Sequence, residues 1–152
     1  MENYFEIKIR MMNADMAMKL MAPLSLGTPE REDRCSYEVV VGSQPKQVLQ
    51  FCSHVAHQLS VRKQGAGFVI ASSPLDDATA DEARARHPQR KTFNADKKIW
   101  HVGHVLVCLV TVESLGVFLE LHGKDLDALK QIARTIGFSE HHYLTRTYDE
   151  IV

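Results

Sequence analysis

The chain has 152 residues, and its 18 lysines and arginines against 19 aspartates and glutamates give a formal net charge of −1 at pH 7. Hydrophobic residues make up 45% and charged residues 24%, values typical of a folded globular chain and too apolar for a disordered one. The near-neutral balance gives no overall attraction to nucleic acid or to a membrane surface, so we expect neither as a partner. The length predicts a single domain spanning residues 1–152.

The cysteines and the apolar runs bear on location. Cys35, Cys52 and Cys108 are an odd number at wide spacing and form no CxxC pair, so a reducing compartment is the simplest interpretation. The first ten residues carry four charges and lack the apolar stretch of a signal peptide. The longest apolar run, 105–112, is far below the roughly 20 residues that span a bilayer. We therefore predict a cytoplasmic protein with no membrane segment.

Strict alternation predicts a strand over residues 3–10, with Phe5, Ile7 and Ile9 on one side and charged residues on the other. Asn13 is a good N-cap for a short Met-rich helix over 14–22, which stops before Pro23. Residues 23–34 suit a loop, and 36–41 a short strand. The methionine cluster of residues 11–21 favours flexible core packing, but it or an exposed strand edge could support a homodimer.

The middle of the chain is less regular. Residues 43–59 fit a second helix with Pro45 in its first turn, on which His54 and His57 would have a spacing that could bind zinc, although such histidines are usually plain surface or core residues. Two strands over 58–64 and 67–72 would form a hairpin. The segment 75–90 is rich in charge and alanine, which fits either a solvated helix or a mobile loop.

The C-terminal third gives the clearest pattern. Three strands over 99–102, 105–112 and 117–122, separated by turns at Gly103 and at 114–116, predict a β-meander. Asp125 is placed to cap a following helix, and Gly137 to end it. The apolar residues of that helix share one face, namely Leu126, Leu129, Ile132, Ala133 and Ile136.

Several predicted strands carry a charged face, and two explanations are open. The charged side chains either face water or, if the sheet closes into a barrel, line a polar interior around an anionic ligand. Glu6, Lys8 and Arg10 share one face of the first strand, and Glu120 shares a face of its strand with His122. Such a mixture suits a metal-triphosphate site, because cations hold phosphate oxygens while carboxylates hold a hard divalent ion.

These residues also carry a resemblance to a known family. The start YFEIKIR is similar to the ExExK strand of the CYTH family, which includes class IV adenylyl cyclases and thiamine triphosphatases. VTVESLGVFLELHG resembles that family's VEGLGxFxEIE-type turn, IGF with RTYDEIV resembles its closing LGF and RSYxELL, and LSVRKQGAGFVIASSP resembles its LRIR and LTYKGP hairpin. The resemblance touches both ends and the middle of the chain, through short motifs of which several are altered.

The resemblance implies an α+β fold, an eight-stranded antiparallel β-tunnel with helices packed outside, and a lumen that binds triphosphates with Mg²⁺ or Mn²⁺. It assigns Glu6 and Glu120 as metal ligands and implies Lys8, Arg10 and Arg62 as catalytic residues. The ligand-binding residues that it implies are Lys8, Arg10, Arg62, Lys97 (or its neighbour Lys98) and Arg146. Where the family has an acid, this chain has Tyr4, Val110 or His122, and Ser72 stands where the family has a lysine.

The family chemistry implies a protein that binds ATP or another triphosphate with a divalent metal, and three functions follow from it. An adenylyl cyclase would use Lys8, Arg10, Arg62 and Arg146 to stabilise charge as the 3′-hydroxyl attacks the α-phosphate. A triphosphatase would use the same site with water as the nucleophile. Because the inventory of acids and cations is depleted, a non-catalytic relative that binds a phosphorylated ligand or a protein is the alternative.

Overall fold

The computed structural model describes residues 2–53 and 55–151. Its strands are β1 (Glu2–Met11), β2 (Arg31–Val40), β3 (Lys46–Phe51), β4 (Ala56–Gln64), β5 (Gly67–Leu75), β6 (Arg90–Val102), β7 (Val105–Val112) and β8 (Gly116–Gly123). Its α-helices are α1 (Ala14–Leu20), α2 (Asp77–Arg86), α3 (Leu126–Thr135) and α4 (Tyr148–Ile151), with short 3₁₀ turns at Ala22–Leu24 and Glu140–His142. No helix in this part of the chain is long and apolar enough to cross a membrane.

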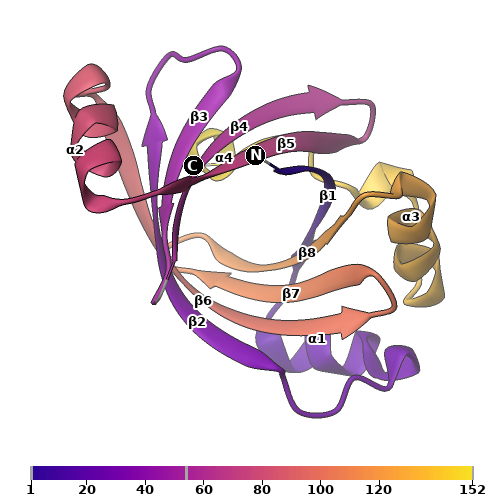
Figure 1. Cartoon of the computed structure of the whole chain (residues 1–152). Coiled ribbons are helices and arrows are strands. Elements are labelled where there is room, and N and C mark those ends of the chain that lie inside the picture. The colour runs from indigo at the N-terminus through magenta and orange to yellow at the C-terminus, as the bar shows by residue number, and fades with distance from the viewer. Residues whose placement is uncertain (1, 54, 152) are drawn as a thin grey trace.

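The strands form a closed antiparallel barrel in the order β1-β5-β4-β3-β2-β6-β7-β8 (Figure 1). The barrel closes because β1 pairs with β5 on one side and with β8 on the other. The β1–β8 register sets Glu6 opposite His122 and Lys8 opposite Glu120. Since successive side chains point to opposite faces of a strand, this register gathers the polar residues of both strands in the lumen.

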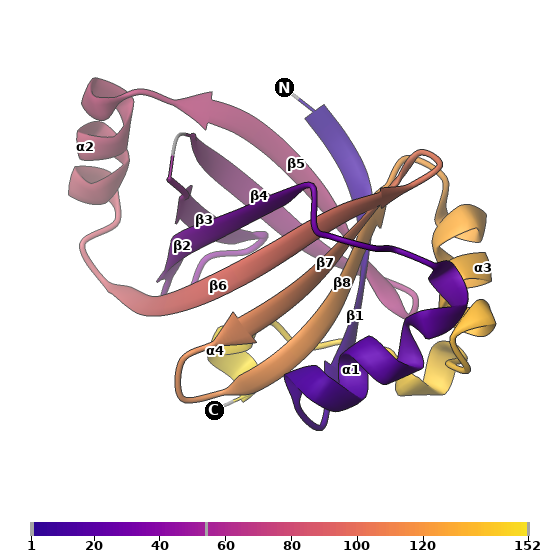
Figure 2. The same cartoon turned by 90° about the horizontal axis from the view of Figure 1, so that it is seen from below.

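The opposite face of the same strands packs under helices. Ile7 and Ile9 of β1 belong to a buried cluster with Leu129 and Ala133 of α3 and Ala17 of α1. Both helices lie against this side of the barrel, whereas α2 lies well apart from them (Figure 2). Burial of this face is the main apolar gain of the fold, because each fully buried side chain of this size contributes roughly 1.5–3 kcal/mol.

Inside the barrel a second apolar cluster fills part of the lumen. It includes Val48, Leu59 and Ile70 on one wall and Phe118 on the other, with Tyr148 of α4 packed edge-on against Phe118 at a ring-centroid distance of 5.0 Å. The short C-terminal helix therefore contributes a side chain to the barrel interior.

The structure confirms the α+β barrel, the meander and the capped helices. Asn13 accepts a hydrogen bond from the Met16 amide at the start of α1, and Asp125 caps α3 in the same manner. Gly137 follows α3 with a φ of 95°, the left-handed conformation that favours glycine. Of the two alternatives for 75–90, the described structure has a helix, α2, whose start is fixed by a capping box between Asp76 and Thr79.

The predicted helix over 43–59 is wrong, because this segment forms β3 and the start of β4. Val48 and Leu59 are cross-strand partners that both enter the barrel interior. A short apolar stretch of this kind suits two strands as well as one helix, and tertiary pairing decides between them. The proposed zinc spacing is lost with the helix, since His57 lies on β4 and His54 lies outside the described residues. β2 also begins earlier than predicted, at Arg31.

The closed barrel removes one of the two features on which a homodimer was expected. The closed pairing of the described strands leaves none of them as a free sheet edge. Met12 is 84% exposed, and Met16 and Met18 are also exposed, so these methionines on and before α1 are the remaining basis for that expectation.

The structure has a disulfide between Cys35 of β2 and Cys52, 17 residues apart, which the cysteine spacing did not predict. Because disulfides are typical of oxidising environments, this pairing removes the basis for interpreting the cysteines as a sign of a reducing compartment. Cys108 is free and buried. In the chain-entropy description, closing a loop of this length stabilises the fold by about 3 kcal/mol.

Thiol counting tests this pairing. Unreduced protein in guanidinium should show one thiol to a chromogenic reagent, and prior reduction should raise the count to three and lower the melting temperature. A Cys52→Ser variant should melt at the temperature of reduced wild type and should not respond to reductant. Three thiols in unreduced, freshly purified protein would contradict the pairing.

Candidate functional site

The barrel encloses a cavity of about 960 Å³. All eight strands contribute to its lining, from Glu2 of β1 to Glu120 and His122 of β8. This volume lies at the upper end of the range found for small-molecule sites, so the lumen can hold a ligand of drug-like size.

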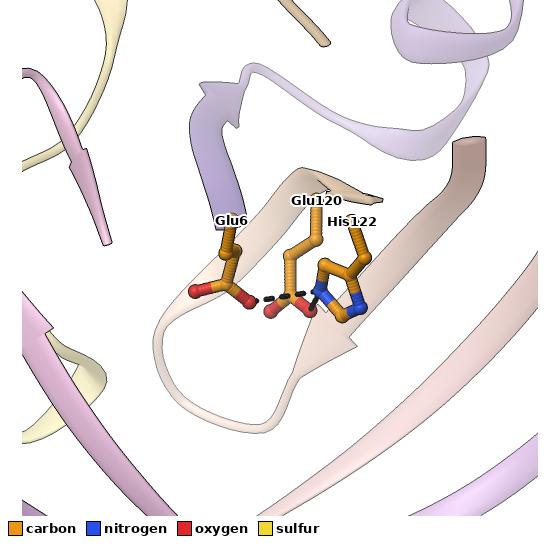
Figure 3. A group of neighbouring side chains, drawn as sticks. All are labelled: Glu6, Glu120 and His122. Carbon is orange, nitrogen blue, oxygen red and sulfur yellow. Dashed lines mark hydrogen bonds and ion pairs between the residues drawn. The ribbon is translucent and has the colours of Figure 1, made fainter. Parts of the chain in front are cut away.

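Three potential metal ligands converge at the centre of the lumen. Glu6 comes from β1, and Glu120 and His122 come from β8, with their side chains directed toward one another (Figure 3). His122 Nε2 lies 2.9 Å from Glu6 Oε1 and 3.1 Å from Glu120 Oε1. The ligand atoms of the three residues all lie within 4.8 Å of one another, which fits a single divalent cation.

Two buried lysines flank these carboxylates. Lys8 Nζ lies 3.9 Å from Glu6 Oε2, and Lys97 Nζ lies 3.9 Å from Glu120 Oε1. Lys97 comes from β6. Both ammonium groups are almost entirely shielded from solvent, with side-chain exposures of 5% and 7%. Buried charges persist only when they are paired, so each lysine and its carboxylate depend on each other.

The electrostatics keep this cluster ionised. Burial disfavours the charged form of Glu120, but Lys97 and His122 outweigh that effect and hold the pKa of Glu120 well below its usual range. Burial likewise lowers the pKa of Lys97, but its neighbours, among which Glu120 carries a negative charge at neutral pH, raise it well above its usual range. The pKa of His122 is raised in spite of burial, because its ring hydrogen-bonds Glu120 and Glu6.

Aromatic residues hold the cluster in place. The Tyr148 hydroxyl donates to Glu120 Oε2, and the Tyr148 ring lies 3.8 Å from Lys8 Nζ in a cation–π contact. The ring of Tyr4 lies 5.2 Å from the ring of His122. Contacts of this kind restrict the side chains of the cluster to a few rotamers before a metal or phosphate binds.

The structure brings together four of the residues that the resemblance assigned: Glu6, Lys8, Lys97 and Glu120 all line the cavity. It does not bring the three arginines there. Arg10 is exposed, with Nη2 donating to the Leu115 carbonyl at 2.8 Å. Arg62 is exposed between Val61 and Lys63 and lines a separate pocket of about 450 Å³. Arg146 is exposed and is not part of the cavity lining.

His122 contributes more to the site than the family resemblance implied. The resemblance treats His122 as the replacement of an acid, but its imidazole contacts both of the retained carboxylates. The signal was present in the alternation of the strand, which puts Glu120 and His122 on one face. Tyr37 and Tyr4 also line the lumen, and no motif pointed to Tyr37.

Together the fold and the site describe a barrel whose lumen holds a buried group of carboxylates, imidazole and ammonium ions. No protein-family model matches the chain, and no curated protein matches its sequence. Similar solved structures do exist. A conserved hypothetical protein from Pyrococcus furiosus superposes with a TM-score of 0.78 at 13% identity, over 98% of this chain and 99% of that one.

Two further structures bear on the fold. The PH1012 protein from Pyrococcus horikoshii has a TM-score of 0.78 at 16% identity, and covers 98% of this chain and 99% of its own. A protein from Vibrio parahaemolyticus titled a "putative adenylate cyclase" has a TM-score of 0.66 at 13% identity, over 99% of this chain and 97% of that one. At these identities the likeness concerns the fold alone.

The raised pKa of His122 predicts a pH dependence of stability in metal-free protein. A raised folded-state pKa stabilises the fold fully below the ordinary value of 6.5, and this contribution is lost as the pH rises through the folded-state pKa. Each unit of the shift corresponds to about 1.4 kcal/mol. In EDTA, the melting temperature should therefore fall as the pH is raised from 6 through the folded-state pKa of His122.

The variant His122→Gln isolates this effect, because an amide can donate to the carboxylates but does not titrate. Its melting temperature should lack most of that decline, whereas the exposed control His141→Gln should retain it. Identical pH profiles for His122→Gln and wild type would contradict the assignment.

Proposed function

We propose that the lumen binds a phosphorylated small molecule together with a divalent metal ion. The observation that carries this proposal is the convergence of Glu6, Glu120 and His122 within 4.8 Å of one another, with the buried Lys8 and Lys97 beside them in the barrel cavity. The cavity also admits ligands of the size of ATP, the triphosphate that the sequence resemblance implies.

The residues divide into two roles. Glu6, Glu120 and His122 hold the metal, which is Mg²⁺ or Mn²⁺ by family resemblance; carboxylates suit both ions, and an imidazole nitrogen favours Mn²⁺ over Mg²⁺. A bound divalent ion supplies charge neutralisation for phosphate oxygens. Lys8 and Lys97 supply ammonium donors to the same oxygens from two different strands.

The count of lumenal cations limits how much negative charge the site matches. Lys8 and Lys97 are each balanced by one carboxylate, and Arg10, Arg62 and Arg146 do not line the cavity. Two further cations of the lining, Arg31 and Lys124, are exposed, and Arg31 is paired with Asp33. A triphosphate carries several negative charges, whereas a ligand with one or two phosphoryl groups needs fewer cations. This favours the binding of a phospho-ligand over turnover of ATP as the primary activity.

The catalytic alternatives remain proposals with a defined chemistry. Cyclisation of ATP to cyclic AMP and pyrophosphate, or hydrolysis of a triphosphate, would need further positive charge near the departing phosphates. The structures from Vibrio parahaemolyticus and Bacillus halodurans titled "putative adenylate cyclase" are the support for the first. Product analysis after incubation with ATP and either metal distinguishes cyclase, triphosphatase and binding protein.

Metal binding is tested without a phosphate ligand. Mn²⁺ or Mg²⁺ should raise the melting temperature relative to EDTA, since a ligand at a hundred times its dissociation constant adds about 2.7 kcal/mol of stability. Glu6→Gln should remove this shift, because it takes away one of two anionic ligands. Glu113→Gln, an exposed glutamate paired with Arg34 on the outside, is the matched control and should retain it. Equal shifts in both variants would exclude Glu6 as a ligand.

Phosphate contact is tested with two adjacent lysines. Lys97 is buried in the lumen beside Glu120 and Lys98 is exposed on the opposite face of β6, so Lys97→Met and Lys98→Met make the same change on the two sides of the barrel. Binding of ATP, inorganic triphosphate or thiamine triphosphate with Mn²⁺ should weaken about tenfold or more in Lys97→Met. Lys98→Met should bind as wild type does. Equal losses in both variants would place the phosphate outside the lumen.

A further inference from the structure

The lumen has two chemically different sides. The buried charged cluster lies on β1, β8 and β6, at Glu6, Lys8, Lys97, Glu120 and His122, whereas other charged residues of the lining, such as Arg31 and Lys124, are exposed. The wall formed by β2, β3, β4 and β5 presents a group of aliphatic side chains to the same cavity, beside polar ones that include Gln50, His57 and Ser72. The aliphatic side chains are Val39, Val48, Leu59, Val61 and Ile70, each of them buried in the barrel.

The aliphatic residues form one continuous surface because their strands pair in register. Val39 pairs with Val48, and Val48 pairs with Leu59, across three neighbouring strands. Val61 pairs with Ile70 one row further along. The phosphate and metal site proposed above uses none of these residues, so this aliphatic surface is left without an assigned partner.

Tyr37 provides a second, independent observation. Its hydroxyl is the one fully buried side-chain nitrogen or oxygen without a hydrogen-bond partner in residues 2–53 and 55–151. Tyr37 is 6% exposed and lines the cavity on β2, two residues before Val39. Lys97 Nζ lies 5.6 Å from the centre of its ring, and the Tyr148 ring lies 6.1 Å away. Tyr37 thus stands between the aliphatic wall and the charged centre.

The protonation state of Tyr37 is defined. Burial raises the pKa of its hydroxyl well above the ordinary value of 10.0, so the group is a neutral donor at physiological pH. An unpartnered buried hydroxyl is costly, and a ligand that accepts its hydrogen bond recovers that cost.

We propose that the aliphatic wall and the Tyr37 hydroxyl form the subsite for the organic group of the ligand, and that the ligand is a phosphate ester of an apolar alkyl or aryl alcohol with one hydrogen-bond acceptor. This inference rests on the proposed function, because Lys8 and Lys97 hold the phosphate end.

The chemistry of the wall disfavours a nucleotide in this orientation. The hydroxyls of a ribose and the edges of a base need several hydrogen-bond partners when they are buried. Val39, Val48, Leu59, Val61 and Ile70 offer none from their side chains, whereas an alkyl or aryl group gains from contact with them. The hydrogen-bonding side chains of β3 to β5 in the lining are confined to Gln50, His57 and Ser72. One acceptor on that group is matched by the one unpartnered donor, Tyr37.

A series of phosphate probes tests the subsite by NMR titration of the full chain with Mn²⁺ replaced by diamagnetic Mg²⁺. The probes are inorganic phosphate, ribose 5-phosphate, phenyl phosphate, and the 3- and 4-acetyl derivatives of phenyl phosphate. Phenyl phosphate should bind about tenfold tighter than inorganic phosphate, and ribose 5-phosphate should gain little over inorganic phosphate. At least one acetyl isomer should bind tighter than phenyl phosphate.

Variants assign these gains to residues. Tyr37→Phe should abolish the advantage of the acetyl isomer while leaving the affinity for phenyl phosphate unchanged. Val61→Thr keeps the side-chain volume but adds a hydroxyl to the wall, and should weaken phenyl phosphate severalfold without affecting inorganic phosphate. Val69→Thr, on the same hairpin but outside the cavity lining, is the matched control and should match wild type.

The outcomes separate the two proposals. If inorganic phosphate binds but phenyl phosphate is no tighter, or if ribose 5-phosphate gains as much, the apolar subsite is overturned and the phosphate site stands. If Tyr37→Phe leaves the acetyl advantage intact, Tyr37 is not the donor, and the subsite as proposed is overturned. If no phosphate probe binds, both proposals fail.

Discussion

The pairing of charges inside the barrel is the constraint on which the rest of the structure depends. Lys8 and Glu6 lie on one strand, and Lys97 and Glu120 meet from two others. Ions removed from water are tolerated only with such partners. The β1–β8 register places the ions in the lumen and the apolar residues Ile7 and Ile9 under the helices. A shift by one residue would reverse both, because it would turn the ions toward the helices and place Ile7 and Ile9 in the lumen.

The same register gives the lumen a charged side and an aliphatic side. A ligand meets the buried ammonium, imidazole and carboxylate groups of β1, β6 and β8 on one side, and on the other side the aliphatic cluster of β2 to β5 with a few polar residues. The polar end of a ligand can therefore contact only the charged side favourably, and its apolar end the aliphatic side. This preference fixes the orientation of the ligand without a large number of hydrogen bonds. Tyr148 links the two halves, since it donates to Glu120 while its ring packs near that of Tyr37.

Local signals were sufficient where one residue fixes a conformation. Asn13 and Asp125 cap their helices as predicted, and alternation along β1 and β8 identified the residues that share the lumen. Between 43 and 59 the sequence was ambiguous, because Val48 and Leu59 fit a helical stripe as well as a cross-strand pair. The pairing of Cys35 with Cys52 depends on where β2 and the end of β3 meet, and sequence spacing carries no such information.

The arginines show why matching motifs does not define a site. Arg62 follows Val61, and because the side chain of Val61 lies in the cavity, its neighbour faces the other way. Arg10 hydrogen-bonds a turn carbonyl instead of facing the charged centre. Among the described residues, the buried cations of this lumen are two lysines, Lys8 and Lys97, whereas Arg31 and Lys124 line the cavity as exposed residues. Because phosphate charge must be matched by cations in a closed site, the ligand depends on which residues face inward and not on the fold alone.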